Sequence, residues 1–271
     1  MTLASLALAG GAAAGGGGPS PGVVTGWDGT LAEAGTVRYV ALPAARATVV
    51  AAVRTSDGRV LRYVTVPGSF GIPQVAFDGT TEGVSRDGKT LVLATYAGVA
   101  GVTSFAVLST EPLRLRKTVK LRGNWSFDAL SPDGRTLFAI EYLGTGEPLR
   151  YNVRAVSLVT GRPLGAPIVD KREPDEEMNG SPVTRVTGTD GTWAYTLYGK
   201  PDGTAFVHAL DTRHRRAACI DLPWRGVQKA LWNVRMSVRG GALVLTQRGS
   251  RLASIDTRAF VVRAFRRPVA P

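Results

Sequence analysis

Residues 128–142 read Asp-Ala-Leu-Ser-Pro-Asp-Gly-Arg-Thr-Leu-Phe-Ala-Ile-Glu-Tyr, and residues 82–96 repeat that pattern as Glu-Gly-Val-Ser-Arg-Asp-Gly-Lys-Thr-Leu-Val-Leu-Ala-Thr-Tyr. A third copy at 185–198 reads Arg-Val-Thr-Gly-Thr-Asp-Gly-Thr-Trp-Ala-Tyr-Thr-Leu-Tyr. Residues 235–247 keep the pattern without the Asp, and residues 31–42 form a more divergent copy. Self-similarity at a regular spacing indicates an array of equal structural units. The chain therefore contains five copies of one unit.

Each copy is followed by an apolar run that ends in a turn with a hydroxyl residue. The five hydroxyl positions are Ser56, Thr110, Thr160, Thr212 and Thr257. They are separated by 54, 50, 52 and 45 residues. Four strands of ordinary length joined by short turns need a segment of about this size.

Within a unit the side chains alternate with a period of two. Residues 91–96 place apolar side chains on both faces, as expected for a strand that packs between two neighbouring sheets. Glycine accepts a positive φ, and Asp-Gly is therefore a hairpin signal. The Ala-rich stretch 44–53 has a β-branched centre and a place in the repeat, which favour strand over helix. The Asp-Gly pairs begin at Asp28, Asp57, Asp78, Asp87, Asp133, Asp190 and Asp202.

The sequence Ser-Pro-Asp-Gly-Arg-Thr-Leu at 131–137 and Ser-Arg-Asp-Gly-Lys-Thr-Leu at 85–91 carries a family resemblance. Both segments resemble the turn between the first two strands of a blade in WD40-like, TolB-like and YVTN-type β-propellers of bacterial type. The resemblance extends over residues 23–267. The Gly-His and Trp-Asp pairs of eukaryotic-type WD40 repeats are missing, so the TolB and YVTN branches are the better comparison. These propellers include lactonases, protein-interaction platforms, lectins and wall-associated repeats, and fold alone does not select among them.

The fold expected from these patterns is an all-β propeller of five four-stranded blades. Radial stacking of equal sheets leaves no long open edge, which a linear antiparallel array would expose. We expect residues 23–271 to form a single propeller domain in which every unit supplies its own four strands. Residues 1–22 are expected to be a separate Ala/Gly/Pro-rich tail.

The start of the chain has the character of a secretory signal. Residues 3–14 are apolar and end in small side chains, although no Lys or Arg precedes Arg38. An apolar run of this length with small residues after it is typical of an export signal and too short to span a bilayer. We expect export to a secreted, periplasmic or wall-associated location. An Ala/Gly-rich tail without a targeting role is the alternative.

The chain carries 33 Lys and Arg against 21 Asp and Glu, a balance of +12. Such a charge attracts acidic polymers and anionic surfaces. Most of the basic residues are Arg and they are spread along the whole sequence, so no nucleic-acid motif stands out. The local clusters at 213–216 and 266–267 are interpreted as solvated turns.

Charged residues occupy equivalent places six residues before the turn glycine in three units. These are Glu82, Asp128 and Arg185, and the nearest counterpart in the fourth unit is Arg235. In the first unit Asp28 and Glu33 are both eligible. Because the innermost strands of a propeller line its channel, we expect these side chains near the channel mouth. They either form a polar binding site for carboxylate or phosphate oxygens or neutralise one another across the pore.

Tryptophans and carboxylates are further candidates for binding and for catalysis. Trp125 and Trp224 lie in Gly- or Pro-marked connections and are candidates to stack on sugars, whereas Trp193 falls inside a strand. A glycoside hydrolase resembling the five-bladed arabinanases would draw its carboxylates from Asp28, Asp78, Glu82 and Asp128. Hairpin turns explain Asp28 and Asp78 equally well.

Other catalytic chemistries have few residues to support them. One cysteine, Cys219, and two histidines, His208 and His214, furnish neither a disulfide nor the usual zinc shells. No Gly-x-Ser-x-Gly elbow is present. The acidic run at 170–177 lacks the spacing of a calcium loop and is interpreted as a solvated insertion in the third unit. We expect no metal, no cofactor and no catalytic residue.

The function expected from the sequence is therefore a non-enzymatic, exported binding scaffold. Its partner is an envelope protein or an anionic or carbohydrate polymer, and the protein is expected to be monomeric, not integral to the membrane and without specific nucleic-acid binding. The glycoside hydrolase is the alternative.

Overall fold

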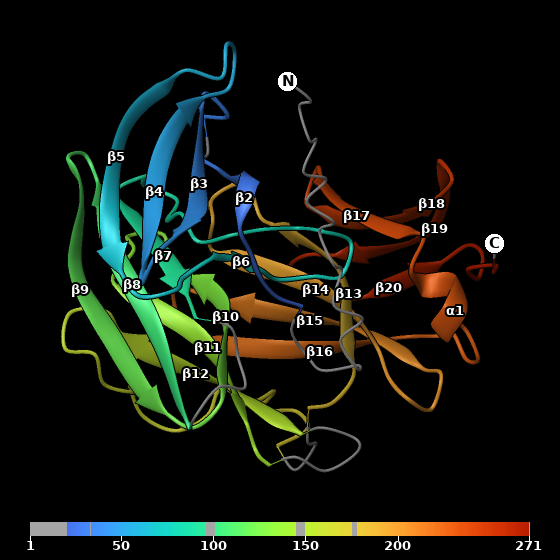
Figure 1. Cartoon of the computed structure of the whole chain (residues 1–271). Helices are drawn as coiled ribbons and strands as arrows, with labels where there is room; N and C mark the ends of the chain where they lie inside the picture. The colour runs from blue at the N-terminus through green and yellow to red at the C-terminus, as the bar shows by residue number, and fades with distance from the viewer. Residues whose placement is uncertain (1–20, 33, 96–100, 145–149, 175–177, 271) are drawn as a thin grey trace, which may run out of the picture.

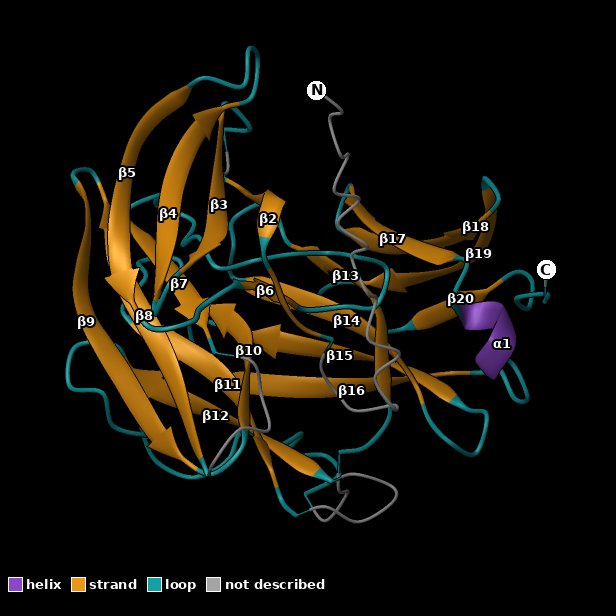
Figure 2. Ribbon diagram, viewed as in Figure 1, coloured by secondary structure: helices purple, strands orange, loops and turns teal. Residues whose placement is uncertain are grey.

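The computed structural model describes residues 21–32, 34–95, 101–144, 150–174 and 178–270. Almost all regular structure is antiparallel strand, and five sheets fan out around a common axis (Figures 1 and 2). The chain folds as a β-propeller, as the repeats predict. Within the described residues no helix is long and apolar enough to cross a membrane.

Three blades are complete four-stranded sheets in chain order. Blade 1 consists of β2 (Gly26–Leu31), β3 (Val37–Ala44), β4 (Ala47–Arg54) and β5 (Val60–Pro67). Blade 4 consists of β13 (Ser181–Thr187), β14 (Trp193–Gly199), β15 (Ala205–Asp211) and β16 (Arg216–Leu222). Blade 5 consists of β17 (Val234–Arg239), β18 (Ala242–Gln247), β19 (Ser250–Asp256) and β20 (Val262–Ala264). One helical turn, α1 (Gln228–Leu231), joins blades 4 and 5.

The other two blades depart from the predicted four strands. Blade 2 has β7 (Thr90–Ala94), β8 (Val102–Thr110) and β9 (Leu113–Arg122), with single bridges from Gly71 and Val84 at its inner edge. Blade 3 has β10 (Trp125–Leu130), β11 (Thr136–Tyr142) and β12 (Tyr151–Ser157), with bridges from Pro163 and Ile168 at its outer edge. A hairpin in blade 2 and an insertion in blade 3 replace the missing regular strands.

The hairpin of blade 2 reaches across the axis. It starts with β6 (Ile72–Gln74), and the backbone N–H groups of Phe77 and Asp78 donate to the carbonyls of Pro182 and Val183 in blade 4. β6 also pairs with β1 (Gly22–Val24), which lies ahead of blade 1 in the chain. Not every unit is therefore built only from its own strands, contrary to the prediction.

The repeated Ser-x-Asp-Gly motif is a hydrogen-bonded turn. In blade 3 the hydroxyl of Ser131 donates to Asp133 at 2.6 Å and accepts from the N–H of Thr136 at 2.9 Å. The motif of blade 2 repeats both bonds with Ser85, Asp87 and Thr90. All seven glycines of the Asp-Gly pairs have positive φ, which explains their selection. The motif thus encodes a local turn, independent of any ligand.

The hydroxyl at the end of the third strand has a structural role as well. Thr110, Thr212 and Thr257 donate to the carbonyls of Gly88, Gly191 and Gly241 in the first turn of their own blades. Blade 1 uses Thr55 in this way, bonded to Gly35, and not the neighbouring Ser56 that the sequence spacing suggests. In blade 3 the equivalent bond comes from a backbone group: the N–H of Leu158 donates to the carbonyl of Arg135. Leu158 lies two residues before the predicted Thr160.

Apolar clusters fill four of the spaces between neighbouring blades. Blades 1 and 2, blades 2 and 3, and blades 4 and 5 each share a cluster, and two smaller clusters lie between blades 3 and 4. No cluster of the described residues joins blade 5 to blade 1. One face of blade 1 carries Val40, Ala51 and Val53, which are buried and form a small cluster of their own, whereas one register row of blade 5 carries Ser237, Val244, Ser254 and Arg263 opposite its shared core.

The first turns of blades 2, 3 and 4 meet at one end of the axis. The N–H of Asp87 donates to the carbonyl of Pro132, and a Cβ added to Gly134 would lie 2.5 Å from Oγ1 of Thr90. A Cβ added to Gly191 would lie 2.8 Å from Cγ of Arg86. Glycine is therefore required at Gly134 and Gly191 for close approach as well as for positive φ.

The insertion of blade 3 is anchored and not merely a solvated loop. Asp170 is buried, and its carboxylate accepts hydrogen bonds from Arg172 and from the backbone N–H of Cys219 in β16. Burial raises the pKa of Asp170, but these hydrogen bonds and the charge of Arg172 outweigh it and hold the pKa at about 2. The insertion is thereby tied to blade 4. Residues 175–177 of the acidic run lie outside the described residues.

Replacement of Gly134 by Ala tests the close packing of the turns. Gly88, with φ of +70° and open space at the added Cβ, is the matched control. We expect Gly88→Ala to lose about 1 kcal/mol of unfolding free energy from the left-handed conformation alone. Gly134→Ala is expected to lose about 1–3 kcal/mol more because of the clash with Thr90. Urea unfolding measures both, and equal losses would contradict close approach of the turns.

Replacement of Asp170 by Asn tests the anchor through its pH dependence. A pKa held below the unfolded value means that the carboxylate stabilises the fold above about pH 4 and loses this effect as the pH falls toward 2. The difference in unfolding free energy between the native chain and Asp170→Asn should be about 2 kcal/mol near neutral pH and shrink over that range. Thermal or urea unfolding at several pH values measures it; a constant difference would show that Asp170 is not held ionised.

Candidate functional site

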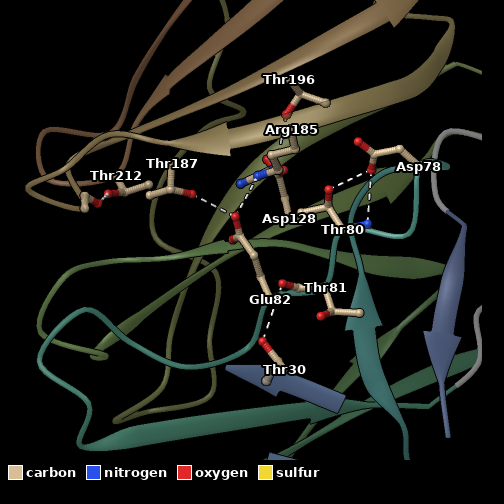
Figure 3. A network of polar contacts seen from close by, with 11 residues as sticks. Thr30, Asp78, Thr80, Thr81, Glu82, Asp128, Arg185, Thr187, Thr196 and Thr212 are labelled. Carbon is tan, nitrogen blue, oxygen red and sulfur yellow. Dashed lines mark hydrogen bonds and ion pairs between the residues drawn. The ribbon is translucent and has the colours of Figure 1, made fainter. Parts of the chain in front are cut away.

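Three of the charged residues singled out in the repeats meet at the axis. Arg185 of β13 donates from Nε to Oε1 of Glu82 at 3.0 Å and from Nη1 to Oδ1 of Asp128 at 2.6 Å (Figure 3). Glu82 lies just before β7 and Asp128 lies in β10, so the guanidinium joins blades 2, 3 and 4. The structure thus brings Glu82, Asp128 and Arg185 into one cluster, which we name the axial cluster.

Local irregularity in the strands positions these side chains. The register of β10 against β11 shifts between Phe127 and Ala129, so Asp128 occupies a bulge. A bulge redirects a side chain relative to a regular strand. Arg185 by contrast pairs regularly with Thr196 of β14, whose hydroxyl oxygen accepts from Nη1 at 3.1 Å.

The axial cluster is buried and largely satisfied. The side chains of Arg185 and Asp128 are 1% and 4% exposed, and that of Glu82 is 22% exposed. The hydroxyl of Thr187 donates to Glu82 at 2.8 Å. Among the buried polar atoms of the cluster, Oδ2 of Asp128 and Nη2 of Arg185 have no hydrogen-bond partner within the described part of the chain. The cluster is therefore an internal ion network with little surface open to a ligand.

Burial and the charges of the cluster shift the pKa values of Arg185, His208 and Tyr198. Burial disfavours the charged form of Arg185, but Glu82 and Asp128 outweigh it and raise the pKa of the guanidinium. Burial lowers the pKa of the neighbouring His208 and raises that of Tyr198. His208 is a packed histidine at 2% exposure, as the sequence suggests, and it supplies no proton at neutral pH.

Other predicted residues are not brought to the axial cluster. Arg235 is exposed, and its Nη1 donates to the carbonyls of Trp232 and Val234 of its own blade at 2.9 Å. Asp78 accepts from the N–H and hydroxyl of Thr80 and forms a turn beside the cluster (Figure 3). Asp28 is exposed on β2. Glu33 lies outside the described residues.

The expectation that Trp125 and Trp224 stack on sugars is wrong. Trp125 is 4% exposed in the core between blades 2 and 3, and its Nε1 donates to the carbonyl of Arg122 at 2.6 Å. Trp224 is 3% exposed in the core between blades 4 and 5. Neither ring offers a face to a ligand, because both pack into apolar clusters between blades; Trp125 is the first residue of strand β10 and does not lie in a connection.

Sequence reasoning missed the threonines around the axis. The hydroxyls of Thr187 and Thr196 are hydrogen-bonded to the cluster. Between blades 1 and 2, the hydroxyl of Thr30 donates to the carbonyl of Thr81, and the hydroxyl of Thr81 donates to the carbonyl of Gly29 at 2.8 Å. The hairpin register around the turn at 188–191 places Thr196 opposite Arg185. The contact between these two residues could therefore have been predicted from the sequence. The contacts between blades had no sequence signal.

The fold is shared with several solved structures. The chain is similar to hydrazine synthase of Kuenenia stuttgartiensis, with 19% identity, a TM-score of 0.53, and coverage of 84% of this chain and 63% of that one. The acylaminoacyl peptidase of Pyrococcus horikoshii is similar at 10% identity and a TM-score of 0.50, over 88% of this chain and 38% of that one. The Dos1 propeller matches at 9% identity and a TM-score of 0.46, over 84% of this chain and 54% of that chain.

These similarities concern fold alone. No protein-family model and no curated protein matches the sequence. The chain spans less than two thirds of the length of the hydrazine synthase and peptidase chains, and identities below one fifth do not transfer an activity.

Removal of either buried partner of the axial cluster tests its structural role. Asp128→Asn leaves the buried guanidinium of Arg185 with Glu82 as its one remaining ion-pair partner, and Arg185→Met leaves the carboxylates of Asp128 and Glu82 without their counter-ion. Each variant should lose about 3–5 kcal/mol of unfolding free energy. The double variant should lose about 1–3 kcal/mol less than the sum. Urea unfolding of the four proteins gives this coupling.

The exposed pair of Arg62 and Glu111, at 29% and 79% exposure, is the control. Glu111→Gln should change the unfolding free energy by less than about 0.5 kcal/mol. Additive losses in the Asp128 and Arg185 series would show that the two residues do not act as one network.

Proposed function

We propose that this protein is a non-enzymatic propeller scaffold that binds an anionic partner, an envelope protein or a wall polymer, outside the cytoplasm. The observation that carries the proposal is the closed axial cluster. Its two carboxylates, Glu82 and Asp128, are two of the four candidates for a glycosidase of this architecture, and both are ion-paired with Arg185.

The ion network explains why catalysis is disfavoured. A carboxyl that acts as general acid or base must reach the substrate, whereas Glu82 and Asp128 are both hydrogen-bonded to the buried guanidinium of Arg185. Asp78 is committed to its turn with Thr80. No group of three or more His, Cys, Asp or Glu that suits a metal occurs among the described residues.

The charge distribution supports an anionic partner. The chain carries a balance of +12, and the side chains of the 213–216 turn are exposed at the rim. Positive potential over a rigid surface accelerates encounter with acidic partners and selects against basic ones. A propeller of fixed blades offers such a surface at little cost in ordering.

Export is the part of the proposal that rests on sequence alone. The apolar run at 3–14 followed by small residues supports it. Fractionation of the producing cells tests it, with the chain expected outside the cytoplasm.

Two assays on purified protein test the binding function against the enzymatic alternative. Polyphosphate, a polyuronate and a synthetic acidic peptide are titrated at several salt concentrations, and we expect binding whose affinity falls as salt rises. Incubation with arabinan and xylan, with and without calcium, should release no reducing sugar. Hydrolysis that is lost in Asp128→Asn at a temperature where the variant is folded would support the enzyme instead. Failure to bind every anionic probe would refute the scaffold.

A further inference from the structure

A groove lies on the rim of blades 3, 4 and 5, away from the axial cluster. Its volume is about 750 Å³, and it runs between the insertion of blade 3, the turn from β15 to β16, and the turn from β19 to β20. Cavities of this size are ordinary for ligand sites. We name it the rim groove.

The turns of blades 4 and 5 that border the rim groove differ from those of the other blades at one position, which has positive φ. The fourth residue after the end of the third strand has positive φ in four blades, and in blades 1 and 3 it is glycine, Gly58 and Gly161, at +72° and +80°. In blades 4 and 5 it is Arg215 and Phe260, at +54° and +55°. A residue with a Cβ is strained there, and such strain gathers at binding sites. In blades 4 and 5 the backbone is therefore strained at Arg215 and Phe260, the two positions whose large side chains line the groove.

The charges of the rim groove are only partly neutralised. Arg172 is paired with Asp170, and Arg216 and His214 are paired with Asp211. Three more cationic side chains line the groove and form no ion pair with any described residue: Lys171, Arg215 and Arg258. All three are exposed. The groove thus offers exposed positive charge at its border, although Arg258 lies near the carboxylate of Asp256 in its own turn.

The wall beneath these cations is apolar. Leu164 and Ile168 of the insertion face Trp193 and Phe260, whose rings meet edge to face at 5.4 Å. Trp193 in turn stacks on Tyr195 at 6.1 Å, which fixes its orientation. A purely ionic polymer would pair with the cations but leave this apolar wall in water.

We propose that the rim groove binds an acidic protein segment that carries one large apolar or aromatic side chain. The apolar side chain packs against Trp193, Phe260 and Leu164, and flanking carboxylates pair with Lys171, Arg215 and Arg258. Charge complementarity and an apolar anchor together match this ligand better than a polyphosphate or polyuronate. The inference rests on the proposed binding function and assigns its site and partner class.

Glycine substitution gives a test free of folding artefacts. Arg215→Gly restores the residue that blades 1 and 3 use, so the variant should unfold at the same or a higher denaturant concentration. Arg46 and Arg248 also have positive φ, at +57° and +49°, are exposed, and lie outside the groove. Arg46→Gly and Arg248→Gly are therefore matched controls that remove the same charge and the same strain.

The probe is a fluorescent twelve-residue peptide in which Asp and Glu flank one Trp. We expect Arg215→Gly to weaken its binding about tenfold and each control to weaken it less than twofold. A peptide with Ala in place of the Trp should bind the native chain about tenfold more weakly.

The other outcomes separate the two proposals. Equal losses in Arg215→Gly and the controls would overturn the rim groove as the site while leaving an anion-binding scaffold intact. Binding of polyphosphate that depends on Arg215, without peptide binding, would keep the site and overturn the protein segment. Native chain that binds neither the peptide nor any polymer overturns both.

Discussion

The guanidinium of Arg185 is the interaction on which the inner architecture depends. A buried arginine loses its hydration, and this loss is tolerable only because carboxylates from two other blades meet it at hydrogen-bond distance. Glu82 and Asp128 are held in turn by the same charge. The innermost strands of blades 2, 3 and 4 are thereby fixed near one point, and their first turns pack against each other at the end of the axis.

The remaining parts of the ring are held differently. Four interfaces between blades are apolar, whereas blades 1 and 5 share no apolar cluster in the part of the chain that the structure describes. Blade 1 is instead connected inward by the threonine contacts of Thr30 and Thr81 and by the apolar cluster it shares with blade 2. The described part of the chain therefore packs apolar clusters between successive blades from blade 1 to blade 5, whereas Val40, Ala51 and Val53 of blade 1 are buried in a small cluster of their own.

Charge has separate tasks at the axis and at the rim. At the axis it is buried, paired and structural, because an uncompensated ion there would destabilise the fold. At the rim Lys171, Arg215 and Arg258 keep their charge in water above an apolar wall, where it is available to a partner. The proposed binding function uses the rim because the axis is already occupied by the protein itself.

The repeated unit, its five copies and the propeller class could be predicted from the amino-acid sequence. The glycine turns and the equivalence of Glu82, Asp128 and Arg185 could be predicted as well. All of these follow from local backbone rules repeated at a fixed spacing. Tertiary structure alone decided that Arg185 joins the two carboxylates, that Arg235 turns back on its own blade, and that Trp125 and Trp224 are buried. It also decided the hairpin across the axis and the anchor at Asp170. Such contacts depend on the distance and orientation between blades, which no local pattern encodes.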